Sequence, residues 1–351
     1  MTGANDNGCV PQPADDLPPA ALLTVSNLHV TLNTARGPAQ ALRGVSFEIA
    51  RGATLGLIGE SGCGKSLTAL ALLGLLPPGA QLGGSILLAG QELVGLPERE
   101  LCGLRGNRIG MVFQEPMTAL NPLHTIGAQV AEPLRLHHAL SATSARAQAL
   151  RLLDQVRLPN AAQRLSAYPH QLSGGQRQRV GIAMALACGP ELLIADEPTT
   201  ALDVTLQSEI LDLIHELVAD AGMALLLISH DLGVMARMAQ QLLVMYGGSV
   251  VEAGPTAQVF ERLAHPYTRG LFAARPQLGA ARVNGRKPRL ATIPGRVPEL
   301  ADLPHGCRFA DRCGWALDAC RAAPPPAVGV GAGHLARCIR LADIHASAHP
   351  A

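Results

Sequence analysis

The sequence lacks any long hydrophobic run and any leader-like start. Its longest apolar stretches, such as Met223–Ile228, fall far short of the roughly 18 residues that a membrane-spanning helix needs. The first twenty residues are polar and proline-rich and have no basic start, so they do not have the form of a secretory signal. These absences predict a soluble, cytosolic chain that reaches a membrane only through a partner, with a flexible tail at residues 1–21.

Basic clusters and lysines are also scarce. The formal net charge is +1 and no run of basic residues stands out, which argues against a nucleic acid as a partner. Lysine occurs only at positions 65 and 287, so Lys65 is conspicuous in its glycine-rich setting. Cysteine is better represented, with eight residues. In a cytosolic protein they indicate metal binding, catalysis or core packing rather than disulfides.

Short β-rich runs alternate with helical stretches from Leu22 onward. The hydrophobic fraction of 48% supports a sizeable core, and the alternation is typical of an α/β domain built on a mostly parallel sheet. Pro77 and Pro78 are expected to stop the first helix, and Gly247 and Gly248 suit a tight turn between two strands. The predicted buried strands span residues 54–58, 109–113, 192–195 and 224–229, and the first helix spans residues 65–76.

Changes of character divide the chain further. A helix-rich stretch at about residues 125–175 has no strand signals and is interpreted as an insertion into the sheet domain. Past His265, prolines, glycines, arginines and cysteines become dense and periodicity fades. We therefore predict a sheet domain at 22–264, a small irregular cysteine-rich extension at 265–340 and a short tail at 341–351.

A glycine-rich segment, Gly59-Glu-Ser-Gly-Cys-Gly-Lys-Ser66, matches G-x-x-x-x-G-K-[ST] between a predicted strand and a predicted helix. Its glycines let backbone N–H groups curl around an anion, and the helix N-terminus adds a favourable dipole. Lys65 then meets the β- and γ-phosphates, and Ser66 reaches Mg²⁺. The alternative is a turn that binds nothing. The candidate phosphate-binding residues are Gly59, Glu60, Ser61, Gly62, Cys63, Gly64, Lys65, Ser66 and Leu67.

A second motif is an apolar strand that ends in two carboxylates, Leu192-Leu-Ile-Ala-Asp-Glu197. Asp196 is placed to face magnesium, and Glu197 is placed to polarise a water in line with the γ-phosphate. A solvated strand end is the alternative when this motif stands alone. Together with the phosphate-binding loop, the motif predicts a purine-nucleoside triphosphatase.

A third segment, Leu172-Ser-Gly-Gly-Gln176, precedes Arg-Gln-Arg-Val and an apolar helix and lies about twenty residues before Asp196. Its polar and glycine residues at a helix start form a second anion-cradling site. With the two motifs above, it resembles the signature of the ATP-binding cassette family. The resemblance implies an α/β P-loop NTPase fold with a mostly parallel core sheet, an antiparallel β subdomain and a helical insertion. The signature residues are Ser173, Gly174, Gly175 and Gln176.

The resemblance also assigns roles to single residues. Gln114 matches the glutamine that touches metal and water and relays to membrane subunits, and His230 matches the switch histidine that contacts the γ-phosphate. Asp203 matches a loop that crosses the interface of a head-to-tail dimer. Leu32 stands where the family usually stacks an aromatic ring on adenine. The implied catalytic residues are Glu197, His230 and Gln114, and the implied Mg²⁺ ligands are Ser66, Gln114 and Asp196.

Phrases across most of the chain resemble the dipeptide and oligopeptide importers within that family. They lie at residues 113–122, 168–179, 265–271 and 293–298. The resemblance implies a peripheral ATPase subunit on the cytoplasmic face of the inner membrane, with ATP and Mg²⁺ as cofactors. Its implied partners are a second, paralogous ATPase subunit, two transmembrane permease subunits and, indirectly, an extracytoplasmic solute-binding protein. Nickel importers share this architecture and remain an alternative.

Two other classes of function compete with a transporter subunit. A soluble cassette protein for translation or DNA repair usually has two cassettes or a long coiled-coil insertion, and this chain has neither. A regulatory module that senses nucleotide without hydrolysis is disfavoured by the intact Glu197 and His230.

Four cysteines in the extension form a further candidate site. Four thiolates in a cytosolic chain can hold zinc or an iron–sulfur cluster, but gaps of five, six and seventeen residues do not fit the paired spacing of zinc knuckles. The peptide-importer resemblance implies a [4Fe–4S] cluster here. Four unrelated cysteines in a poorly ordered tail are the alternative. The residues are Cys307, Cys313, Cys320 and Cys338.

Overall fold

Two β-sheets organise the chain. The structure is a computed structural model and describes residues 21–115, 119–200, 202–275 and 292–346. Residues 1–20 of the predicted tail therefore lie outside the described residues, and its last residue, Ala21, begins the first strand. The smaller sheet is antiparallel, in the strand order β2-β1-β4-β5. Its strands are β1 (Ala21–Thr34), β2 (Gly37–Ala50), β4 (Gln81–Leu88) and β5 (Gln91–Glu92). It supplies the expected antiparallel subdomain.

The larger sheet has eight strands, of which five neighbours, in the order β9-β3-β8-β7-β6, are parallel. Every residue of β3, β7 and β8 is buried, as in strands covered on both faces. The four predicted buried strands are therefore confirmed, with ends that differ by one residue at most. The bounds are β3 (Thr54–Ile58), β6 (Ile109–Val112), β7 (Leu192–Asp196), β8 (Ala224–Ile228) and β9 (Gln241–Tyr246).

Antiparallel strands continue this sheet beyond β9. Gly247 and Gly248, with φ of +55° and +78°, form the predicted turn into β10 (Ser249–Pro255). A hairpin from the far end of the chain, β11 (Val328–Gly331) and β12 (His334–Ala336), then pairs with β10. No strand was predicted for these residues, and the hairpin joins the extension to the core sheet.

The first helix ends earlier than predicted. The helix α1 (Lys65–Leu72) is capped at Leu73, and Gly74 follows in the left-handed region with φ of +62°. A glycine in this conformation is a common helix stop because it has no Cβ to clash. Gly74, rather than Pro77 and Pro78, therefore ends the helix.

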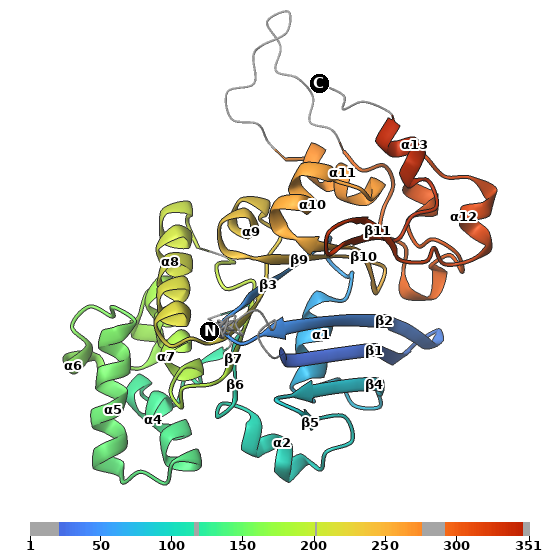
Figure 1. The fold of residues 1–351 in the computed structure, drawn as a ribbon. Coiled ribbons are helices and arrows are strands. Elements are labelled where there is room, and N and C mark those ends of the chain that lie inside the picture. Colours follow the sequence, from blue (N-terminus) through green and yellow to red (C-terminus); the bar gives the residue numbers. More distant parts are fainter. Residues whose placement is uncertain (1–20, 116–118, 201, 276–291, 347–351) are drawn as a thin grey trace, which may run out of the picture.

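The helix-rich segment is confirmed. Between residues 119 and 175 the described chain contains helices and no strand. Its main helices are α4 (Ile126–His137), α5 (Ala142–Gln155) and α6 (Ala161–Arg164), followed by the 3₁₀ turn η1 (Pro169–Gln171). Thr125 and Ser141 accept backbone N–H groups at the starts of α4 and α5. In Figure 1 this segment, in green, lies well apart from the orange and red C-terminal part.

The remaining helices pack around the large sheet and the extension (Figure 1). They are α2 (Glu98–Leu104), α7 (Gly174–Ala185), α8 (Val204–Asp220), α9 (Leu232–Met238), α10 (Thr256–Arg262), α11 (Pro266–Ala273), α12 (Asp318–Ala322) and α13 (Leu341–Ala346), with the 3₁₀ turns η2 (Leu300–Asp302) and η3 (Ala310–Arg312). None of the helices in the described ranges is long and apolar enough to cross a membrane.

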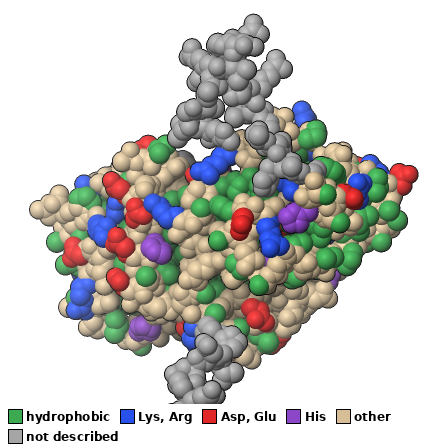
Figure 2. Space-filling view, turned by 45° about the horizontal axis from the view of Figure 1, so that its top comes forward, with side chains coloured by type: hydrophobic (Ala, Val, Ile, Leu, Met, Phe, Trp, Pro, Cys, Tyr) green, Lys and Arg blue, Asp and Glu red, His purple; other side chains and the backbone are tan. Residues whose placement is uncertain are grey.

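Charges are mixed on the face of the molecule that Figure 2 displays. Basic and acidic side chains alternate there, and no continuous basic patch is visible.

The limits assigned to the sheet domain and the extension stay predictions.

Candidate nucleotide site

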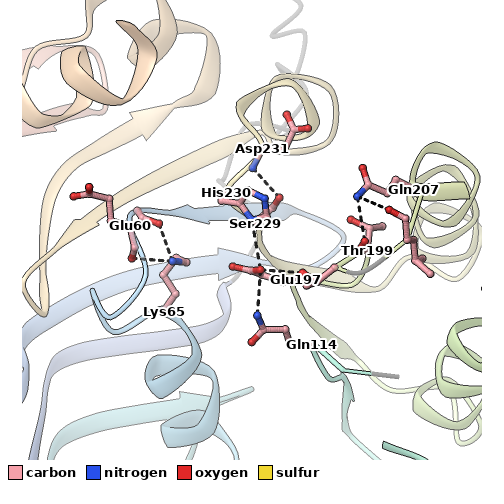
Figure 3. Close-up of polar contacts among 12 residues, drawn as sticks. Glu60, Lys65, Gln114, Glu197, Thr199, Gln207, Ser229, His230 and Asp231 are labelled. Carbon is pink, nitrogen blue, oxygen red and sulfur yellow. Dashed lines mark hydrogen bonds and ion pairs between the residues drawn. The ribbon is translucent and has the colours of Figure 1, made fainter. Parts of the chain in front are cut away.

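The predicted site residues gather where the parallel strands end. Gly59 follows β3, Gln114 follows β6, Asp196 and Glu197 lie at the end of β7, and His230 follows β8. The carboxyl ends of parallel strands meet at one edge of a sheet, which is where open α/β sheets bind ligands. Figure 3 shows Lys65, Gln114, Glu197 and His230 in this region.

Two glycines of the phosphate-binding loop cannot be replaced without strain. Gly59 has a φ of +153°, and a Cβ there would lie 2.3 Å from the carbonyl oxygen of Met245. Gly64, the N-cap of α1, has a φ of +105°, and a Cβ there would lie 2.6 Å from Leu42 Cδ2. The glycines thus let the loop turn tightly against β9 and β2 while the start of α1 faces the site.

Lys65 is nearly buried, and its amine is held by the loop itself. Its Nζ donates to the carbonyl oxygens of Gly59 at 2.7 Å and of Glu60 at 3.1 Å. Both contacts are with neutral acceptors. A phosphate oxygen is a stronger, charged acceptor, so it can replace one of them without leaving the ammonium group unpartnered.

Asp196 is buried, and part of its carboxylate has no partner. Its Oδ1 makes no hydrogen bond within the described structure. Burial raises the pKa of Asp196, while a hydrogen bond with Ser66 and the charge of Lys65 act in the opposite direction. An orphaned carboxylate oxygen beside a serine hydroxyl is the oxygen-rich setting that Mg²⁺ prefers.

Three side chains of the site contact the carboxylate of Glu197. Its Oε2 accepts from Gln114 Nε2 at 3.3 Å and from Thr200 Oγ1 at 2.9 Å, and it lies 3.4 Å from His230 Nδ1. Its backbone φ of +45° is strained for a residue with a side chain. The His230 ring is 71% exposed.

The signature segment forms a capping box at the start of α7. Ser173 Oγ accepts the N–H of Gln176, and the Gln176 side chain accepts the N–H of Ser173. Gly175 packs so closely on α8 that a Cβ would lie 2.4 Å from Leu206 Cδ2. Within the described residues, no hydrogen bond or ion pair joins Ser173–Gln176 to the phosphate-binding loop. The structure does not bring the two anion cradles of one chain together.

Other predicted residues have structural roles as well. Asp203 Oδ1 accepts the N–H of Leu206 and so caps α8. Leu32 is half-buried on β1 opposite Ala39. Sequence analysis missed two residues. Thr200 donates a hydrogen bond to Glu197. The side-chain amide of Gln207 donates to the carbonyl oxygens of Thr199 and Leu202. Thr200 lies three residues after Glu197, and a hydroxyl so close in sequence to the carboxylate pair was the available signal.

The four cysteines of the extension line one pocket. His265, Phe309 and Trp315 lie around the same space. Burial raises the pKa of Cys307 to about 11 and also raises the pKa values of Cys313 and Cys338. Among the described residues, no three His, Cys, Asp or Glu side chains form a group that could hold a metal ion. The predicted [4Fe–4S] cluster therefore has no support from ligand geometry, whereas the convergence of its four predicted ligands is observed.

Two family models match the chain. The model described as "ABC transporter" matches residues 42–200, and the model described as "Oligopeptide/dipeptide transporter, C-terminal region" matches residues 251–320. The first covers the phosphate-binding loop, the signature and the carboxylate pair. The second covers three of the four cysteines.

Similar proteins cover nearly all of the chain. A protein of Brucella melitensis named as a peptide import ATP-binding protein is 49% identical over 93% of this chain and 98% of its own length. A protein of Sinorhizobium fredii named as a peptide ABC transporter ATP-binding protein is 47% identical over 92% of this chain and 96% of its own length.

Solved structures resemble the sheet region. A dimeric ATP-binding cassette in a post-hydrolysis state with ADP and Pi has a TM-score of 0.60 and 31% identity, and the match covers 67% of this chain and 98% of that one. The cbiO1 protein of Clostridium perfringens, part of the cbiONQ transporter complex, has a TM-score of 0.58 and 28% identity, covering 69% of this chain and 92% of that one.

Proposed function

Since the chain belongs to the ATP-binding cassette family of transporter ATPases, we propose that it hydrolyses ATP to drive the import of dipeptides or oligopeptides. The observation that carries the catalytic part is the carboxylate of Glu197, held by Gln114, Thr200 and His230 at the strand ends beside Lys65. This carboxylate is the base that orients and deprotonates the attacking water. The phosphate-binding loop supplies the binding site for the nucleotide.

The residues around Asp196 fit a magnesium ion. Its unpartnered Oδ1 and the adjacent Ser66 hydroxyl would hold the ion, with Gln114 nearby from the end of β6. When bound, Mg²⁺ neutralises charge on the β- and γ-phosphate oxygens. Lys65 adds a fixed positive charge, and the exposed His230 is free to turn toward the γ-phosphate.

The test is the substitution Glu197→Gln, which keeps the side-chain size and removes the base. We expect ATP binding to persist and turnover to fall by at least about 100-fold, because general-base catalysis contributes that much. Filter binding of labelled ATP and release of phosphate measure the two effects. Glu191→Gln is the matched control, since Glu191 lies beyond the other end of β7 and pairs with Arg51 and Arg108. Turnover of Glu197→Gln at the native rate would refute the assignment.

A second ATPase subunit completes the site. Ser173–Gln176 caps α7 and offers its helix N-terminus to an anion, yet among the described residues no hydrogen bond or ion pair joins it to the loop of its own chain. In a head-to-tail dimer each ATP lies between the loop of one subunit and the signature of the other. We assign the second subunit to a paralogue, with Asp203 at the interface.

Permease subunits dock beside Gln114. A largely apolar cavity of about 210 Å³ there is lined by Met111, Phe113, Leu120 and Met184, among others. Phe113, which directly precedes Gln114 in the chain, is a large apolar residue that is 44% exposed and so is accessible to a partner. An apolar segment of a permease in this cavity would sense movement of Gln114. We therefore propose that the chain lies on the cytoplasmic face of the inner membrane, with a solute-binding protein on the other side.

Peptides are the proposed cargo because of the C-terminal match and the names of the relatives. Nickel or another small solute is the second candidate. The ATPase subunit touches neither solute, so the cargo is tested by uptake rather than by ATP hydrolysis.

We propose a [4Fe–4S] cluster in the cysteine pocket. Four thiols converge there, and burial raises the pKa values of Cys307, Cys313 and Cys338, so these three stay protonated until a metal displaces the protons. A four-iron cluster is several ångströms across, so its sulfur ligands need not be within reach of one ion.

Protein purified without oxygen is expected to absorb broadly near ~400 nm and to contain about four irons per chain. The variant Cys313→Ser is expected to lose both signals, while Cys102→Ser, at an exposed cysteine of α2, keeps them. A colourless, iron-free native protein prepared in this way would contradict the cluster and leave the ATPase proposal intact.

A further inference from the structure

The C-terminal extension contacts the phosphate-binding loop through an ion pair at Glu60. Arg312, in η3, donates from Nη1 to Glu60 Oε2 at 2.6 Å and from Nη2 to Glu60 Oε1 at 3.0 Å. The Arg312 side chain is only 5% exposed and that of Glu60 28%. A paired fork of this kind fixes direction as well as distance.

Arg312 is itself fixed in place. Its Nε donates to the carbonyl oxygen of Pro294 at 2.8 Å, and Nη1 also lies 3.4 Å from Tyr246 Oη. The guanidinium lies over the rings of Tyr246 and Phe309, at 5.7 and 6.0 Å from their centroids. These contacts hold Arg312 within the extension, so the position of Glu60 is coupled to the docking of the extension.

A second contact fixes the backbone of the same residue. The N–H of Glu60 donates to Tyr267 Oη at 2.7 Å. Tyr267 is fully buried in α11, with its ring 4.7 Å from that of Tyr246 and 5.4 Å from that of Phe309. Side chain and backbone of Glu60 are thus both held by residues beyond His265.

The contacts of Glu60 also affect Lys65, because the Lys65 amine donates to the carbonyl group of Glu60. The carbonyl oxygen of Glu60 is one of the two carbonyl acceptors of Lys65 Nζ, and Figure 3 shows the Glu60 carboxylate turned away from that amine. The orientation of Glu60 therefore helps to set the position of the Lys65 ammonium group before a phosphate binds. Because the N–H of Glu60 is donated to Tyr267, the N–H groups available to the anion are among those of the following loop residues, 61–66.

We propose that Arg312 and Tyr267 are positioning residues for the nucleotide site, so that ATP affinity depends on the docked C-terminal extension. The inference rests on the proposed nucleotide binding and adds a structural control of it. The same short segment, Cys307–Cys313, also carries two of the four cysteines, so the cysteine pocket and the phosphate-binding loop share one support.

The test is the dissociation constant of the full chain for Mg-ADP, measured by calorimetry, since ADP binding needs no turnover. We expect Arg312→Met to raise this constant at least about fivefold, because a misplaced loop loses phosphate contacts. Arg312→Lys should recover part of the loss, since it keeps the charge but not the fork. Tyr267→Phe, which removes one oxygen only, should raise the constant about threefold.

A double-mutant cycle shows whether the effect passes through Glu60. Glu60→Gln combined with Arg312→Met should bind no more weakly than the worse single variant, because both break one interaction. Arg340→Met is the matched control. Arg340 lies in the same extension, is 23% exposed and pairs with Asp343, and no contact between it and the loop is found among the described residues. Its constant should stay within about twofold of the native one.

Native-like affinity in Arg312→Met and Tyr267→Phe would overturn the inference while leaving the proposed function standing. Equal loss in Arg340→Met would also overturn it, since the effect would then be general damage to the extension. If Arg312→Met does not fold, Tyr267→Phe and Glu60→Gln decide. A native chain that binds no Mg-ADP would refute the proposed function and this inference together.

Discussion

Among single residues, Glu197 combines a strained backbone with several side-chain contacts, which supports its proposed role as the catalytic base. Its φ of +45° persists because Gln114 and Thr200 hold its side chain and the carbonyl of Ile228 holds its N–H. Strain of this kind costs of order 1–3 kcal/mol and is kept where the surrounding structure over-determines it. The carboxylate is thereby fixed before a nucleotide arrives, which spares the cost of ordering it during the reaction.

Leu32 offers a test of adenine binding at this scale. Stacking on an aromatic ring stabilises a bound base, and leucine provides only apolar contact. We expect Leu32→Tyr to tighten Mg-ATP binding by about 1 kcal/mol, or roughly fivefold. Fluorescence titration with a labelled nucleotide measures it. Val328→Tyr, at an exposed position of β11, is a control for a new surface tyrosine. Unchanged affinity in Leu32→Tyr would show that adenine does not lie against β1.

Sequence motifs predicted the places in the fold of residues that are close together in the chain. Lys65, Asp196 and Glu197 lie near strand ends as predicted, because a strand followed by a glycine turn or a carboxylate pair places its side chains locally. Their roles stay predictions. The partners of Glu60 could not be assigned. Arg312 lies 252 residues away, and only the packing of the extension on the sheet brings it near.

Among the elements, α7 shows how a structural cap and a ligand site share the same atoms. Ser173 closes the capping box of α7 and is also the proposed contact for the γ-phosphate of the opposite subunit. Arg164 adds a hydrogen bond to Gln176 at 2.9 Å, so the helical segment supports the signature. The start of α7 is therefore ordered without a nucleotide.

Two substitutions at Ser173 separate these roles. Ser173→Ala should lower the free energy of unfolding by about 1 kcal/mol, because it removes the cap. Ser173→Asp keeps a cap acceptor and should stay near native stability, but its negative charge repels the γ-phosphate. Urea denaturation and ATPase activity measure the pair. ATPase activity near the native value in Ser173→Asp would contradict the phosphate role of the signature.

Element boundaries were predictable where a strand is buried on both faces and less so where a single residue decides. The apolar runs of β3, β7 and β8 fixed those strands to within one residue. The end of α1 depended on Gly74 in the left-handed region, which outweighed the later prolines. The hairpin β11–β12 was missed because its residues are small, polar or exposed and acquire strand geometry only by pairing with β10.

At the scale of the whole molecule, the extension is continuous with the catalytic core. It adds β11 and β12 to the large sheet, and it reaches Glu60 through Arg312 and Tyr267. A buried pair, Glu252 on β10 and His334 on β12, joins the two parts at 2.8 Å. Strand pairing and a buried side-chain pair thus both join the extension to the sheet domain.

The central claim is that ATP hydrolysis by this chain drives peptide uptake. It is tested most directly by uptake of a radiolabelled oligopeptide into cells that express the whole transporter with either the native chain or Glu197→Gln, with uptake of radiolabelled nickel measured in parallel. We predict that peptide uptake is lost with Glu197→Gln while the Glu191→Gln control keeps it, and that nickel uptake is the same in all cells. Peptide uptake that persists with Glu197→Gln, or a loss confined to nickel, would contradict the account.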